Sequence, residues 1–337
     1  MYELDYPVIG EPSKYAFANA VLAIMENRLL TQSQLDQFRV ADSFREFNRM
    51  LSETSYGHYL EAGQDINQIV EAETIKTREE LYEILPEETH GFFDVFFRKF
   101  DYNNLKMLLK SYFLEREPDS RELSPMGTIP PEEMVSLFTA GKYDEIPLSI
   151  DFDMFEVMES RMKANQELRL IDSTLDREYY RELLSVSEDQ GDSFFLDFVR
   201  QQIDLKNIII FIRCKKTGLP LESFLLEGGY IDGDVLEGLM GESLDSLVAC
   251  PDLYLYRKVI TDGLTALEKT SSYSDLETSI RNYIISLLGD VRNVIFSIKP
   301  FIGYLLAKEH ELNLLKKFFI HITNSMEFGT ERDLSYV

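Results

Sequence analysis

The sequence predicts an all-α protein in which long helices form three similar subdomains. Helices are indicated by apolar residues that recur at steps of three and four through most of the 337 residues, whereas alternating, strand-like stretches are scarce. Repetition of one helical segment at nearly equal intervals indicates the three subdomains. A chain of this length is also expected to divide, because single hydrophobic cores stop growing beyond about 250–300 residues.

Seven periodic segments predict the main helices in chain order. They span residues 15–30, 66–85, 92–113, 152–171, 194–214, 253–267 and 301–322. The third of them would be ~33 Å long at 1.5 Å per residue, which is enough to cross a subdomain. Long helices of this kind form the framework of the predicted fold.

Capping residues, glycines and prolines separate these segments. Thr31 is followed by a glutamine three residues later, the pattern of a capping box, and Asp42 precedes a further apolar-periodic run. Pro131 begins another helix. The predicted turns and helix starts lie at residues 118–131, 218–220, 228–229 and 299–300.

One helical segment, residues 92–109, finds partners at offsets of 103 and 209 residues. The apolar periodicity stays in register, and polar residues align with it. The aligned polar positions are Asp94 with Asp197, Asp101 with Asp204, Lys99 with Lys308, and Asn104 with Asn207 and Asn313. His310 replaces the aspartate in the third copy. We expect the asparagines to cap helices or to bridge them rather than to bind a ligand.

The repeat spacing predicts where the subdomains begin and end. We expect the first to span residues 1–120, the second 121–219 and the third 220–337. The N-terminal helices of the first subdomain are expected to pack on the others.

Composition restricts the kinds of partner. The 59 acidic and 34 basic residues give a net charge of −25, which repels nucleic acid and anionic lipid and favours partners with basic faces. Neither a signal peptide nor an apolar run near ~18 residues is recognisable, so we expect no membrane span. Cys214 and Cys250 lack a metal or redox spacing and are expected to be buried, reduced thiols.

No pattern of residues predicts chemistry. The four histidines have no spacing that would place two imidazoles on one metal. The aspartate pairs at 151/153 and 232/234 lack the further ligands of a calcium loop, and Gly141 precedes a lysine without a phosphate-binding loop. We therefore expect no catalytic residue, no cofactor and no metal site.

Several stretches carry a family resemblance. Residues 15–20 (Tyr-Ala-Phe-Ala-Asn-Ala), 25–30 (Met-Glu-Asn-Arg-Leu-Leu) and 51–60 (Leu-Ser-Glu-Thr-Ser-Tyr-Gly-His-Tyr-Leu) resemble the C subunit of V-type and A-type ATP synthases, the relative of the eukaryotic V-ATPase d subunit. Residues 304–314 resemble the last long helix of that family. The resemblance spans nearly the whole chain.

The resemblance implies a funnel of three similar helical subdomains about a pseudo-threefold axis. It further implies a non-catalytic central-stalk subunit on the cytoplasmic side of a membrane, where it couples ATP hydrolysis or synthesis to proton or sodium transport. Its partners would be the central shaft subunits and the cytoplasmic loops of the membrane rotor ring. The loops 127–131 and 228–233 are candidates for contact, the alternative being that each is only a solvent-exposed connection.

Two other functions remain open on the sequence alone. One is a free helical adaptor that binds unrelated partners. The other is an all-helical enzyme with a metal–carboxylate site, although the aspartate-rich motif of helical prenyl-processing enzymes is missing.

Overall fold

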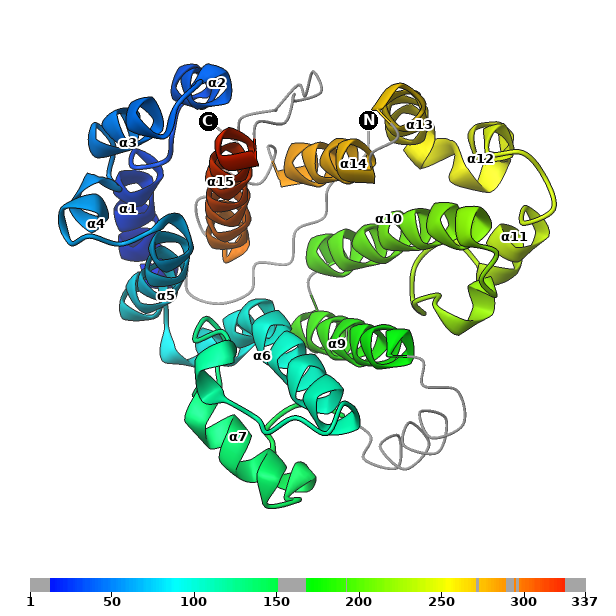
Figure 1. Cartoon of the computed structure of the whole chain (residues 1–337), viewed down its shortest axis with the longest axis horizontal. Coiled ribbons are helices and arrows are strands. Elements are labelled where there is room, and N and C mark those ends of the chain that lie inside the picture. The colour runs from blue at the N-terminus through cyan, green and yellow to red at the C-terminus, as the bar shows by residue number, and fades with distance from the viewer. Residues whose placement is uncertain are drawn as a thin grey trace. The chain divides into compact units, whose positions relative to one another are not determined.

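The computed structural model describes residues 13–150, 168–191, 193–270, 273–288, 294 and 297–324. Among these residues every regular element is a helix and none is a strand, which confirms the all-α prediction (Figure 1). No helix in the described ranges is both long enough and apolar enough to cross a membrane. The segment predicted as a helix over 152–171 lies outside the described residues up to residue 167.

The chain divides into two compact units, residues 1–90 with 285–337 and residues 91–284. The predicted boundaries after residues 120 and 219 stay a prediction. The helices of the first unit are α1 (Ser13–Glu26), α2 (Gln32–Val40), α3 (Phe44–Ser52), α4 (Gly57–Glu61), α5 (Ile66–Ile84) and α15 (Lys299–Asn324).

The remaining described helices lie in the second unit, except that α6 begins one residue before it and α14 ends four residues after it. They are α6 (His90–Phe113), α7 (Pro131–Thr139), α9 (Arg169–Gln190), α10 (Ser193–Thr217), α11 (Gly233–Gly238), α12 (Asp245–Ala249), α13 (Arg257–Thr270) and α14 (Tyr273–Leu288). Single 3-10 turns lie before or after several of them, and a longer one, Pro251–Tyr256, occupies the start of the segment predicted as a helix from residue 253.

Side-chain caps fix where the first helices begin. Thr31 and Gln34 form the predicted capping box at the start of α2. Asp42 precedes α3, as predicted, but the cap is Ser43, whose hydroxyl accepts from the amide of Glu46. The Asp42 amide instead donates to the Glu46 carboxylate at 3.4 Å.

The C-terminal helix α15 lies at the centre of the first unit. It packs on α5, and its C-terminal half contacts α2 and α3. The shared core joins Leu312, Leu315 and Phe318 of α15 to Leu35 and Phe47 of the N-terminal helices. Each of these side chains is at most 5 % exposed, so this core joins residues from the two ends of the chain.

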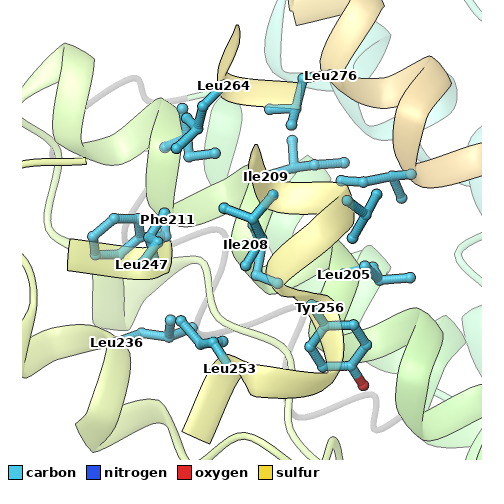
Figure 2. Close-up of a cluster of buried hydrophobic side chains, with 14 of the residues drawn as sticks. Leu205, Ile208, Ile209, Phe211, Leu236, Leu247, Leu253, Tyr256, Leu264 and Leu276 are labelled. Atoms are coloured by element: carbon cyan, nitrogen blue, oxygen red, sulfur yellow. The ribbon is translucent and has the colours of Figure 1, made fainter. Parts of the chain in front are cut away.

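Two antiparallel helices, α9 and α10, form the framework of the second unit. They turn at Gly191, whose φ of 64° is the left-handed conformation that favours glycine. The apolar side chains of α10 pack against the short helices that follow it and against α14 (Figure 2). Leu205, Ile208 and Phe211 are completely buried there. A second apolar cluster joins α6 to α7 and α9.

Helix α9 is missing from the predicted segments except for its first residues. Its buried face carries Glu178, Glu182 and Ser187 in place of apolar residues. The apolar period that revealed the other helices is therefore broken in α9.

Candidate functional site

The aligned Asp101 and Asn104 lie one turn apart on α6 and hold the loop that follows it. Asn104 donates to the carbonyl of Ser124 and accepts from the Ser124 amide, both at 2.8 Å. Asp101 accepts from the amides of Thr128 at 2.7 Å and Ile129 at 3.1 Å. Both α6 side chains are at most 1 % exposed, and their polar atoms are engaged by backbone groups of the loop.

Asp204 and Asn207 make the corresponding contacts from α10. Asn207 donates to the carbonyl of Leu226 and accepts from its amide, again at 2.8 Å each. Asp204 accepts from the Ile231 amide at 2.9 Å and from the Tyr256 hydroxyl at 2.6 Å. The Tyr256 ring lies beside Leu205 at one end of the buried cluster in Figure 2.

Burial governs the electrostatics of this second site. Desolvation raises the pKa of Asp204 above its usual value, although the Tyr256 hydroxyl and the backbone N–H donors partly oppose the rise. Burial and the adjacent carboxylate raise the pKa of Tyr256 as well. Tyr256 therefore stays protonated and acts as a donor to Asp204.

A glycine permits each aspartate to approach its loop. A Cβ at Gly127 would collide with Oδ1 of Asp101, and a Cβ at Gly229 would collide with Oδ1 of Asp204. These glycines belong to the two loops that the sequence suggested as partner contacts. Their backbones are fixed to the helices, while Tyr230, directly after Gly229, remains 51 % exposed.

The third aligned position differs. Asn313 on α15 is half-buried and makes no side-chain hydrogen bond within the part of the chain that the structure describes. The buried polar residues of this helix are Lys308, His310 and Glu311. The structure therefore brings Asp101 together with Asn104 and Asp204 with Asn207, but gives Asn313 no comparable contact.

A charged cluster surrounds Lys308 in the interior of the first unit. The Lys308 ammonium lies 3.0 Å from the Glu73 carboxylate and 3.3 Å from Glu311, and donates to the Tyr56 hydroxyl at 2.8 Å. Tyr56 in turn donates to Glu311, and Tyr59 donates to Glu73 at 2.7 Å. All five side chains are less than 10 % exposed.

The two carboxylates of this cluster differ in their pKa values. Burial raises the pKa of Glu311, and the Lys308 ammonium only partly opposes it. Burial also acts on Glu73, but Lys308 and the Tyr59 hydroxyl outweigh it and hold the pKa of Glu73 below its usual value. The sequence aligned Lys308 with Lys99 as a repeat position, but it did not identify the charged cluster.

Ion pairs and one hydrogen bond, made by side chains at a regular spacing along α6, join α6 to α9. The α6 residues at positions 98, 102, 106 and 110 each lie one turn apart and face α9. The pairs are Arg98 with Glu182, Tyr102 with Glu182 at 2.8 Å, Lys106 with Asp176 at 2.6 Å and Lys110 with Asp172 at 2.5 Å. The buried Glu182 carboxylate, 2 % exposed, lies at the interior end of this series.

The described ranges contain neither a metal-binding cluster nor a disulfide. No group of three metal-ligating side chains occurs there. Cys214 and Cys250 are unpaired and buried, and burial raises the pKa of the Cys214 thiol, which lowers its reactivity. A hollow of about 230 Å³ between α9, α10 and α14 is lined by apolar residues such as Leu205 and Ile280 and by the charged Lys206, Glu277 and Arg281. The described polar groups hold helices and loops together.

Comparison with known proteins identifies the family. The family model described as ATP synthase (C/AC39) subunit matches residues 18–317. Proteins named as the C subunit of an A-type ATP synthase are similar over nearly the whole chain. The one from Desulfurococcus sp. (strain SY) is 27 % identical over 95 % of this chain and 90 % of its own length, and the one from Thermococcus kodakarensis is 24 % identical over 96 % and 90 %.

These matches confirm the resemblance drawn from the sequence. They favour a component of a rotary ATPase over the free adaptor and over the helical enzyme, since the family is a non-catalytic component of that complex. The protein from Methanocaldococcus jannaschii, 24 % identical over 90 % of this chain and 81 % of its own length, carries the same name. This chain belongs to the ATP synthase C/AC39 subunit family.

Proposed function

We propose that this chain is the central-stalk subunit of a rotary V/A-type ATPase and forms the socket between the rotating shaft and the membrane rotor ring. ATP hydrolysis or synthesis elsewhere in the complex would be linked through it to proton or sodium transport. The family match over residues 18–317 carries this proposal.

The physical properties of the chain support such a role. A part that transmits torque must be stiff and must hold its shape under load. Buried hydrogen bonds and ion pairs supply that stiffness here, because each buried polar group that loses its partner costs free energy. The contacts of Asp101, Asn104, Asp204, Asn207 and Glu182 all join a long helix to another part of its unit.

The proposed shape is a funnel of three similar helical subdomains with pseudo-threefold symmetry. The matched contacts of Asp101 with Asn104 and of Asp204 with Asn207 support a repeated unit. The proposed partners are the shaft subunits and the cytoplasmic loops of the ring, which would hold the chain on the cytoplasmic face of the membrane. The loops 127–131 and 228–233 are proposed contacts, with Tyr230 as an exposed aromatic anchor.

Removal of this protein tests the proposed coupling. Complexes are prepared with and without the chain, and ATP hydrolysis and ion pumping are measured on the same reconstituted vesicles. We expect hydrolysis by the soluble head to persist while pumping disappears, and pumping to return when the purified chain is added back. Pumping at the normal rate without the chain would contradict the proposal.

A second measurement tests the partners. A photoreactive amino acid at position 230 should crosslink to a shaft or ring protein in the intact complex, whereas the same group at the exposed position of Lys142 serves as a control for random contact. Equal crosslinking from both positions would remove the loop 228–233 from the proposed interface.

A further inference from the structure

We propose that the N-terminal segment 29–61 completes the third repeat from the opposite end of the chain, and that Glu311 holds it on α15. The proposal concerns contacts within each compact unit. It does not depend on the rotary function.

The second repeat provides the pattern. Asp204, on the long helix α10, accepts from the amide of Ile231, the residue before the N-cap of the short helix α11. It also accepts from the hydroxyl of Tyr256, a buried tyrosine 24 residues after that N-cap, Asp232. A buried carboxylate thus fixes both the start and the end of the segment that follows its helix.

A carboxylate, a backbone amide and a tyrosine hydroxyl meet in the same way on α15, but here the amide and the hydroxyl belong to the N-terminal segment. Glu311 accepts from the amide of Leu30, the residue before the N-cap of α2. It also accepts from the hydroxyl of Tyr56, a buried tyrosine 25 residues after that N-cap, Thr31. The donors therefore have the same chemistry, the same order and nearly the same spacing as those of Asp204.

The first repeat, whose short-helix segment is shorter, shares only the contact between the carboxylate and the amide before the N-cap. Asp101 accepts from the amide of Ile129, the residue before the N-cap Pro130 of α7. The residue before each N-cap is buried, and so is the fourth residue after that N-cap. These residues are Ile129, Ile231 and Leu30, and Met134, Leu236 and Leu35, all at most 6 % exposed.

The pairing of the long helices agrees with this alignment. In each case a long helix contacts the helix that follows its short segment. The contacts are Lys106 of α6 with Asp176 of α9, Gln201 of α10 with Tyr283 of α14 at 3.1 Å, and Lys308 of α15 with Glu73 of α5. The repeat is therefore a long helix, a short-helix segment and a second helix, and the third copy is circularly permuted.

This arrangement defines the repeats as residues 90–190, residues 193–288, and residues 299–324 together with 29–84. It differs from the division at residues 120 and 219 that the sequence spacing predicted. In the first two repeats the backbone joins the long helix directly to its short segment. In the third, Glu311 and the apolar core around Leu315 and Phe318 hold the segment by non-covalent contacts alone.

In the third repeat, residues 29–61 can therefore detach from α15 without a break in the chain. Besides these two donors Glu311 has an ammonium partner, since Lys308 lies 3.3 Å away and also bonds Tyr56. We infer that this additional ion pair compensates for the missing backbone connection.

Hydrogen exchange on the full-length protein tests this assignment. In Glu311→Ala we expect amides of residues 29–61 to exchange at least tenfold faster, while residues 230–256 keep their wild-type rates. The matched variant Asp204→Ala should show the reverse. The amides of α6 lie in neither of the two segments and report on overall folding.

Three outcomes would overturn the proposal: unchanged exchange over 29–61 in Glu311→Ala, unchanged exchange over 230–256 in Asp204→Ala, or equal acceleration of both segments in either variant. If Glu311→Ala does not fold, Tyr56→Phe and Tyr256→Phe decide, because each removes one hydroxyl and should accelerate exchange only in its own segment. The isolated protein suffices for this test, so its failure would leave the rotary proposal unaffected.

Discussion

The side-chain amide of Asn207 bonds both backbone polar groups of Leu226, donating to the carbonyl and accepting from the N–H at 2.8 Å each. Leu226 is 4 % exposed, so solvent cannot easily replace either bond. An asparagine is well suited to this task, because it offers a donor and an acceptor side by side. A buried loop thereby gains the hydrogen bonds that a regular element would have supplied.

Replacement of this asparagine should be costly. In Asn207→Ala two buried backbone groups lose their partners, and we expect the free energy of unfolding to fall by about 2–6 kcal/mol, since each unsatisfied group costs about 1–3 kcal/mol. Urea unfolding measures the change. Asn313→Ala is the matched control and should change stability by less than about 0.5 kcal/mol, because its side chain is half-buried and makes no described hydrogen bond. Equal losses in both variants would contradict this account.

Gly229 should tolerate no side chain. In Gly229→Ala the new methyl group meets Oδ1 of Asp204, and we expect a loss of about 1–3 kcal/mol, the usual cost of overpacking. Gly91→Ala is the control, because a Cβ there meets nothing within 4 Å, and its stability should be unchanged or slightly higher. Thermal unfolding of both variants distinguishes a steric cause from a general effect of replacing glycine.

Arg98 should stabilise the fold through the buried Glu182 carboxylate. In Arg98→Met the carboxylate keeps only the Tyr102 hydroxyl, and we expect a loss of about 3 kcal/mol, because removal of one partner leaves a buried charge uncompensated. Adding Glu182→Gln should recover most of the loss. A double variant no more stable than Arg98→Met would show that the arginine acts through packing.

A surface pair provides the contrast for that measurement. Arg121 and Asp119 lie 2.6 Å apart, but the arginine side chain is 87 % exposed. Arg121→Ala should therefore leave the urea unfolding midpoint nearly unchanged.

The sequence predicted the helical class and several of the helices because their buried faces are apolar at a helical period. The common register also identified Asp101 and Asp204, and Asn104 and Asn207, as equivalent positions of the repeat. It could not identify what they bind, since their partners are backbone groups that any residue carries. Asn104 reaches 20 residues ahead and Asn207 only 19, so the loops fall out of register with the helices.

The third repeat shows a different limit. Sliding the sequence without gaps placed His310 opposite Asp204, whereas the carboxylate that makes the equivalent contacts is Glu311, one residue further on. Its donors, Leu30 and Tyr56, stand at the other end of the chain. An alignment that runs in one direction cannot detect a repeat whose parts appear in reverse order.

The pH dependence of stability should reveal the burial of Asp204. Its pKa is higher in the folded protein than in the unfolded chain, so the protonated form favours folding. This contribution is complete below the unfolded pKa of about 3.9 and is lost as the pH rises through the folded pKa. In Asp204→Asn this side chain is neutral at every pH, so the variant does not lose this contribution as the pH rises. We therefore expect the free energy of unfolding of Asp204→Asn, relative to the wild type, to increase from pH 4 to pH 7, as measured by urea unfolding in buffers of constant ionic strength.

The remaining carboxylates titrate in both proteins and largely cancel in the difference. A difference that stays constant with pH, or decreases, would mean that the Tyr256 hydroxyl and the loop amides stabilise the carboxylate more than burial penalises it.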